Sequence, residues 1–164
     1  MAEERKILPF VPEVRIEDDS YAWLREQAQV LRRRRFDLVH PDAVAEELED
    51  MALSTERALE SDLEQLLCHL LKLQYEPNEN ERRLRGRGWK LSVAEHRNRV
   101  SDILARSAVL RNRFAEFKLK AYLRARKLAG LVMENLPDWN LVFPADCPWS
   151  DQQIVDDDEF FAEP

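Results

Sequence analysis

The chain has 164 residues, of which 45% are hydrophobic and 35% charged, and its formal net charge is −7. Three glycines are too few for the tight turns of a sheet protein, and no stretch approaches the ~20 apolar residues that span a bilayer. A chain of this length can bury a hydrophobic core without disulfides, so the composition predicts one all-α domain over residues 1–164 and no membrane partner.

The chain is expected to begin with an arm and a short helix. Residues 1–19 contain Pro9 and Pro12 and show no helical periodicity, which predicts an extended arm. Ser20 stands at a favoured N-cap position before a helical pattern that ends near Arg34. Apolar residues recur on one side of this helix, at Trp23, Leu24, Ala28 and Leu31.

The longest helical pattern runs from Asp42 to Gln74 and contains no Pro or Gly. Small or apolar residues return every three or four positions, at Leu48, Ala52, Thr55, Leu59, Leu63, Leu66, Leu70 and Leu73. This spacing predicts a helix that buries one side along its whole length. At 1.5 Å per residue the helix is roughly 50 Å long, so we expect the other helices to pack along it in an antiparallel bundle of four main helices.

Two further helices are expected after a break. Residues 75–88 are polar and hold two of the three glycines, which predicts an exposed loop. The third helix has its apolar stripe from Trp89 to Ser107, and Ser107 is expected to cap the fourth. The apolar side of the fourth helix runs from Leu110 to Val132.

The C-terminal residues 137–164 are rich in proline and acidic residues. Aromatic side chains in this segment are expected to pack back onto the bundle: Trp139, Phe143 and Trp149. Ser150 and Gln153 have the spacing of a capping box, which predicts one short final helix.

Charge is divided unevenly along the chain. From Arg82 to Lys127 there are 15 Lys and Arg against 3 Asp and Glu, so this segment carries +12 and the remainder −19. The candidate residues for binding a polyanion cluster at its start: Arg82, Arg83, Arg85, Arg87 and Lys90. Residues 42–64 hold nine carboxylates against Arg57. An acidic helix between basic helices would neutralise the charge internally, and this is the interpretation we favour.

Other chemistry has weaker support in the sequence. Di-iron bundles carry Glu-x-x-His pairs, and none occurs here. His69 and His96 could share a metal if their helices pack together, but we favour hydrogen bonding of each imidazole to a neighbouring helix at the edge of the core. Cys68 and Cys147 are isolated thiols outside any CxxC pair. We therefore expect no cofactor.

Several short stretches carry a family resemblance: SYAWL at 20–24, EELEDM at 46–51, HLLKLQYEP at 69–77 and FPADCPW at 143–149, with Trp89, Arg97, Tyr122 and Ala125-Arg126. In order and spacing, from about Asp19 onward, they resemble the bacterial family called domain of unknown function 29. The resemblance implies an all-helical fold and a bacterial source, and it assigns no activity. The sequence departs from the family pattern at Ala52, usually Gly, at Leu73, often Trp, and at Ala108, often Pro.

Three functions remain open from the sequence. The preferred one is a non-catalytic interaction or structural module of the bacterial cytoplasm, with self-association as an option. The cytoplasm is inferred from the two isolated thiols and from the lack of a signal-peptide-like apolar run in MAEERKILPF. One alternative is binding of nucleic acid or another polyanion through Arg82 to Lys127. A second is a metal-dependent enzyme that uses His69 and His96.

Overall fold

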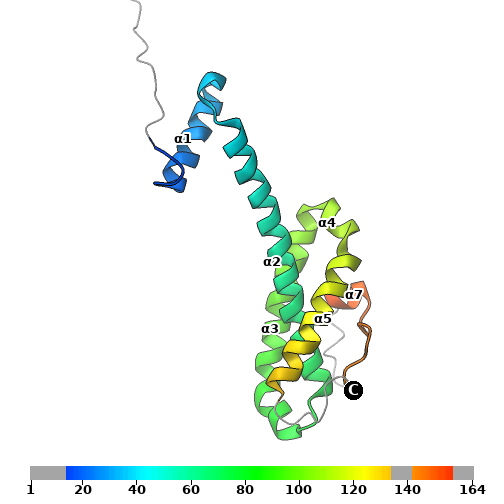
Figure 1. Cartoon of the computed structure of the whole chain (residues 1–164). Coiled ribbons are helices and arrows are strands. Elements are labelled where there is room, and N and C mark those ends of the chain that lie inside the picture. The colour runs from blue at the N-terminus through cyan, green and yellow to red at the C-terminus, as the bar shows by residue number, and fades with distance from the viewer. Residues whose placement is uncertain (1–13, 134–141, 157–164) are drawn as a thin grey trace, which may run out of the picture. The chain divides into compact units, whose positions relative to one another are not determined.

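The computed structural model describes residues 14–133 and 142–156, and this part of the chain is helical and contains no strand. Its elements are α1 (Ser20–Arg32), the short 3₁₀ helix η1 (Phe36–Leu38), α2 (Pro41–Tyr75), α3 (Glu79–Arg106), α4 (Ala108–Asn112), α5 (Phe114–Val132) and α7 (Asp151–Asp156) (Figure 1). The predicted all-α class, with four long helices and a short C-terminal one, is confirmed. None of the described helices has the length and apolar character needed to cross a membrane.

The chain divides into two compact units, residues 1–52 and 53–164. Their boundary falls inside the continuous helix α2, so the division does not decide between one domain and two, and the single domain stays a prediction.

Within the first unit, α1 buries Trp23, Gln27 and Val30. The side chain of Gln27 accepts a hydrogen bond from the backbone N–H of His40 at 3.1 Å, which fixes the chain after η1 against α1.

The two ends of α1 show how it is stabilised. Its N-cap is Asp19, not the predicted Ser20, because the Asp19 carboxylate accepts the N–H of Ala22 at 2.9 Å. At the other end the chain reverses through Arg34, whose φ of 57° lies in the left-handed region. The N–H groups of Arg34 and Arg35 bond back to the carbonyls of Leu31 and Val30, the hydrogen-bond pattern of a Schellman motif.

The core of the second unit is built from α2, α3 and α5, which run side by side in Figure 1. Its buried members include Leu59, Leu63, Leu66, Leu67, Leu70 and Leu71 of α2, Val93 and Val100 of α3, and Phe117, Ala121, Tyr122, Ala125 and Ala129 of α5. The cluster combines large leucines of α2 with small alanines of α5. The packing of the other long helices along residues 59–71 of α2 agrees with the prediction.

The prediction that α2 buries one side along its whole length is wrong for its first part. Leu48 is 61% exposed, and Ala52 and Thr55 are also exposed, whereas Leu59 is fully buried. The apolar spacing is the same in both parts. Burial therefore depends on which segments pack over the helix, and periodicity alone does not report that.

The predicted loop over residues 75–88 is also wrong, because α3 already begins at Glu79. The Asn78 side chain accepts the N–H groups of Asn80 and Glu81, so it caps the helix. Gly86 and Gly88 lie inside α3. Each costs about 1 kcal/mol relative to Ala, less than the N-cap and the many strong helix formers around them contribute.

The fourth helix begins as predicted, with the Ser107 hydroxyl accepting the N–H of Leu110 at 3.2 Å. It is not continuous, however, because the chain leaves helical geometry at Arg113 and divides it into α4 and α5. The Arg113 guanidinium lies 4.9 Å from the centre of the Phe117 ring and pairs with Glu56 and Glu116. The sequence around Arg113 contains no Pro or Gly that signals this break.

Within the described part of the C-terminal segment, Phe143 and Trp149 are buried in the core of the second unit. Trp139 lies outside the described residues. Ser150 and Gln153 form the reciprocal capping box of α7, with N···O distances of 3.0 and 3.2 Å. The guanidinium of Arg97 on α3 donates to the carbonyls of Gln153 and Ile154, which holds α7 on α3.

Candidate functional site

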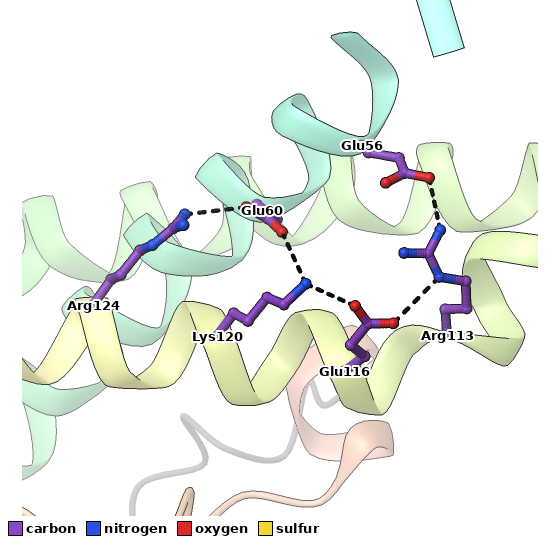
Figure 2. Close-up of polar contacts among 6 residues, drawn as sticks. All are labelled: Glu56, Glu60, Arg113, Glu116, Lys120 and Arg124. Atoms are coloured by element: carbon purple, nitrogen blue, oxygen red, sulfur yellow. Dashed lines mark hydrogen bonds and ion pairs between the residues drawn. The ribbon is translucent and has the colours of Figure 1, made fainter. Parts of the chain in front are cut away.

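Two carboxylates of α2, Glu56 and Glu60, are paired with cations of α5 and of its N-cap residue (Figure 2). Glu56 binds Arg113 at 2.7 Å, and Glu60 lies 3.1 Å from Arg124 and 4.0 Å from Lys120. On α5 itself, Lys120 and then Arg113 hold the pKa of Glu116 below its ordinary value. Internal neutralisation of an acidic helix by a basic one is therefore present along this part of the molecule.

A second cluster joins α2 to α3. Asp62 accepts from Nδ1 of His96 at 2.8 Å, and the Arg99 guanidinium lies 3.6 Å from the same carboxylate oxygen. The Asp62 and His96 side chains are 14% and 17% exposed, so water screens their interaction only partly. This contact fixes the orientation of the His96 ring.

The two candidate metal ligands do meet. The rings of His69 and His96 stack, with centroids 6.4 Å apart and planes at 15°. A metal bound by both would lie in both ring planes, and stacked rings do not provide such a point. No group of three His, Cys, Asp or Glu within residues 14–133 and 142–156 could hold a metal. Burial, with Lys72 and His96 nearby, lowers the pKa of His69 to about 4, so this imidazole is neutral at pH 7.

The basic cluster lies on the first half of α3, not on a loop. Arg82 donates to the backbone carbonyl of Glu76, and Arg85 pairs with Glu81 at 2.7 Å within the same helix. These two arginines therefore stabilise the start of α3, and neither contact involves a side-chain carboxylate of α2.

Arg83, Arg87 and Lys90 are exposed on α3. Within the described ranges neither Arg83 nor Arg87 forms an ion pair. The same stretch exposes Leu84 at 73% and Leu91 at 64%. Arg83 and Arg87 fall in the predicted loop over residues 75–88, and the sequence-based prediction missed the leucines beside them. The spacing of 84, 87 and 91 was the signal that could have found them, because these residues share one side of a helix.

The first part of α2 carries a feature that the sequence analysis assigned to the core. Residues 42–55, called the acidic segment below, contain five carboxylates and no Lys or Arg: Asp42, Glu46, Glu47, Glu49 and Asp50. None of the five forms an ion pair with another described residue. Leu48 is 61% exposed and Met51 66%. The acidic segment is therefore an exposed helical surface with both charge and apolar area.

The remaining chemistry-bearing groups are buried or already engaged. Burial raises the pKa of the Cys68 thiol and that of the Cys147 thiol, so neither is poised as a thiolate nucleophile. A cleft of about 670 Å³ in the second unit is lined by α2 and α3, with acids and arginines together at its wall, including Asp62 and Arg99. In this cleft the Asp62 carboxylate is hydrogen-bonded to His96.

Comparison with known proteins agrees with the resemblance read from the sequence. Neither the curated proteins nor the solved structures contain a match to the chain. The family model described as Domain of unknown function DUF29 matches residues 16–161. The match covers the helices from α1 to α7 and nearly the whole sequence. The chain therefore belongs to the DUF29 family.

Proposed function

We propose that the protein is a non-catalytic helical module of the bacterial cytoplasm that binds a protein with a basic surface through the acidic segment. The observation that carries the proposal is the exposure of Leu48 and Met51, 61% and 66%, within a stretch of five carboxylates and no cation. Apolar side chains surrounded by charges of one sign are typical of a helix that docks on an oppositely charged partner.

A non-catalytic role is supported by how the reactive side chains are used. His96 is bound to Asp62, and burial keeps His69 neutral and without a charged partner of its own. The charged pairs of the second unit join helices to one another, as Glu56 and Arg113 do for α2 and α5. These contacts stabilise the fold, whereas the five carboxylates of the acidic segment form no ion pair with another described residue.

The bacterial cytoplasm is supported by the family resemblance and by the two cysteines. Cys68 and Cys147 are both free thiols. Unpaired cysteines are typical of proteins that fold in a reducing compartment. Detection of the protein in the reduced cytosolic fraction of its host would test this location.

The proposed function predicts that loss of the exposed apolar area abolishes partner binding. Proteins captured by the wild type and by Leu48→Glu/Met51→Glu should be compared, and the captured protein should then be purified and titrated by calorimetry. We expect the double variant to bind at least about tenfold more weakly, since each buried side chain of this size contributes about 1.5–3 kcal/mol. Leu119→Glu on α5 is the matched control, because Leu119 is similarly exposed at 57%. Equal binding by all three proteins would refute the proposal.

Polyanion binding by α3 is the second candidate, because Arg83 and Arg87 are exposed and unpaired in the described residues. The test is fluorescence anisotropy with random-sequence duplex DNA or RNA over a salt series. For a DNA duplex, log affinity falls with log salt by about 0.9 per phosphate contact, so Arg83→Gln/Arg87→Gln should flatten the slope by nearly 2. An unchanged slope, or negligible wild-type affinity at physiological salt, would exclude this candidate.

A further inference from the structure

One side of α3 forms a surface that is basic and apolar at once, and the name basic α3 surface is used here for Arg83, Leu84, Arg87, Gly88 and Leu91. All five residues are exposed, Leu84 to 73% and Leu91 to 64%. Residues 83–91 hold four cations and no carboxylate. Desolvating the two leucines would be favourable, and a negatively charged partner would be attracted to the arginines.

Gly88 lies at the centre of this surface. A glycine inside a helix costs about 1 kcal/mol relative to alanine, and an added Cβ at Gly88 would meet nothing within 4 Å in this structure. Gly86 differs, because it is buried and its added Cβ would lie 4.0 Å from Leu73. Packing among the described residues therefore does not require a glycine at 88. A glycine between two exposed leucines leaves room for another helix to approach the α3 backbone closely.

The acidic segment matches the basic α3 surface in spacing and in charge. Leu48, Ala52 and Thr55 follow one another by four and three residues, and so do Leu84, Gly88 and Leu91. Each set spans about 10 Å of helix. The acidic segment has five carboxylates without a cation, whereas residues 83–91 have four cations without an acid.

We propose that the protein self-associates, with the acidic segment of one copy docked on the basic α3 surface of a second copy. This inference rests on the proposed function and names the basic partner as the chain itself. One chain carries both surfaces, so the contact needs no second kind of protein. Pairing of two acidic segments with each other would instead bring like charges together, which opposes association.

Sedimentation velocity of the full chain at increasing concentration tests the inference. We expect a species of twice the 19.4 kDa chain mass that dissociates as salt rises from about 0.1 M to 1 M, where the screening length falls from about 10 Å to 3 Å. Arg83→Glu/Arg87→Glu should remain monomeric under conditions that dimerise the wild type. So should Glu46→Lys/Glu47→Lys/Glu49→Lys, which leaves two carboxylates against three lysines in the acidic segment. Helical circular dichroism equal to that of the wild type shows that each variant is folded.

The decisive measurement mixes the two charge-reversed variants in equal amounts. The reversed α3 surface is then complementary to the reversed acidic segment, and the two unaltered surfaces remain complementary, so the mixture should regain the dimer mass. Leu119→Gln on α5 serves as the control and should dimerise like the wild type. Gly88→Gln improves helix propensity but places a side chain where the second copy would approach the α3 backbone, so this variant should remain folded and monomeric. Gly86→Ala should dimerise.

Two results would overturn the inference. A wild-type chain that stays monomeric at every concentration excludes self-association, and a dimer that both charge reversals leave intact uses other surfaces. Neither result refutes the proposed function, which requires only that a protein with a basic surface binds less tightly to Leu48→Glu/Met51→Glu than to the wild type. If that partner is also unaffected, the proposed function itself fails.

Discussion

The two parts of α2 have nearly the same sequence character and different surroundings. From Leu59 to Leu71 its leucines are buried, and the nearby Glu56 and Glu60 pair with cations of α5. In the acidic segment Leu48 is 61% exposed and five carboxylates have no ion pair among the described residues. An apolar stripe and a run of acids therefore form part of the core where other segments cover them and an exposed surface where none does.

Leucine-to-alanine substitutions should give the largest difference in the free energy of unfolding between the two parts of α2. Leu63→Ala should lower the free energy of unfolding by about 2–5 kcal/mol, because it leaves a cavity among fully buried side chains. Leu48→Ala should change it by less than about 0.5 kcal/mol in dilute solution, where an exposed residue has little packing to lose. Urea unfolding at low protein concentration measures both. Similar losses for the two variants would show that the first part of α2 is covered as well.

The part of α2 that is packed in the core contains His69, which should make the free energy of unfolding depend on pH. Its pKa is about 4 in the fold against 6.5 for an exposed histidine, so the unfolded chain binds the proton more readily. The free energy of unfolding therefore does not depend on this group above pH 6.5 and decreases as pH falls toward 4. The decrease is at most about 1.4 kcal/mol per pH unit and, because the ring is only half-buried, about 2 kcal/mol in all.

The check on His69 is to measure urea unfolding of the wild type and of His69→Gln between pH 7 and pH 4. Carboxylates titrate in both proteins, so the difference between the two curves isolates the imidazole. We expect the variant to show the shallower dependence on pH. Parallel curves would mean that His69 takes up its proton in the fold.

The all-α class, the long helix and the C-terminal capping box could be predicted because they depend on local patterns. Ser150 and Gln153 are neighbours whose chemistry fixes a helix start, and the structure has both of their hydrogen bonds. The start of α3 could not be read in the same way, because two glycines and a polar composition hid the cap at Asn78. Exposure of the acidic segment depends on distant residues, which no local pattern contains.

For the candidate site residues, the sequence predicts which side chains lie near one another better than it predicts the contacts that each side chain makes. His69 and His96 meet because their stripes lie on helices that pack together, yet the stacking of their rings and the bond from His96 to Asp62 are matters of side-chain orientation. Arg83 and Arg87 were recognised from charge alone. Their apolar neighbour Leu84 was not, because a residue placed in a loop has no defined face.

Removal of a single carboxylate should change the free energy of unfolding by different amounts in the two parts of α2, and this difference should be smaller than that between the leucine substitutions. Glu60→Gln breaks the contacts to Lys120 and Arg124 and should cost about 1 kcal/mol, the upper range for partly exposed pairs. Glu49→Gln has no ion pair to lose and should cost about zero or stabilise slightly by relieving repulsion. Thermal unfolding in low salt and in about 1 M salt checks this, since screening should narrow the gap. A larger loss for Glu49→Gln would reveal a cation that pairs with it.

The smallest expected effect is a gain in stability in the first unit. Arg34 has a φ of 57° at the end of α1, a conformation that glycine adopts without the Cβ penalty. Arg34→Gly should therefore stabilise the first unit by about 0.5–1 kcal/mol, since the strain is removed and the Schellman hydrogen bonds remain. Amide hydrogen exchange locates the gain. Slower exchange at Val30 and Val44 with no change at Leu63 would mean that the two parts of α2 open separately, whereas equal slowing along the helix would mean that they unfold together.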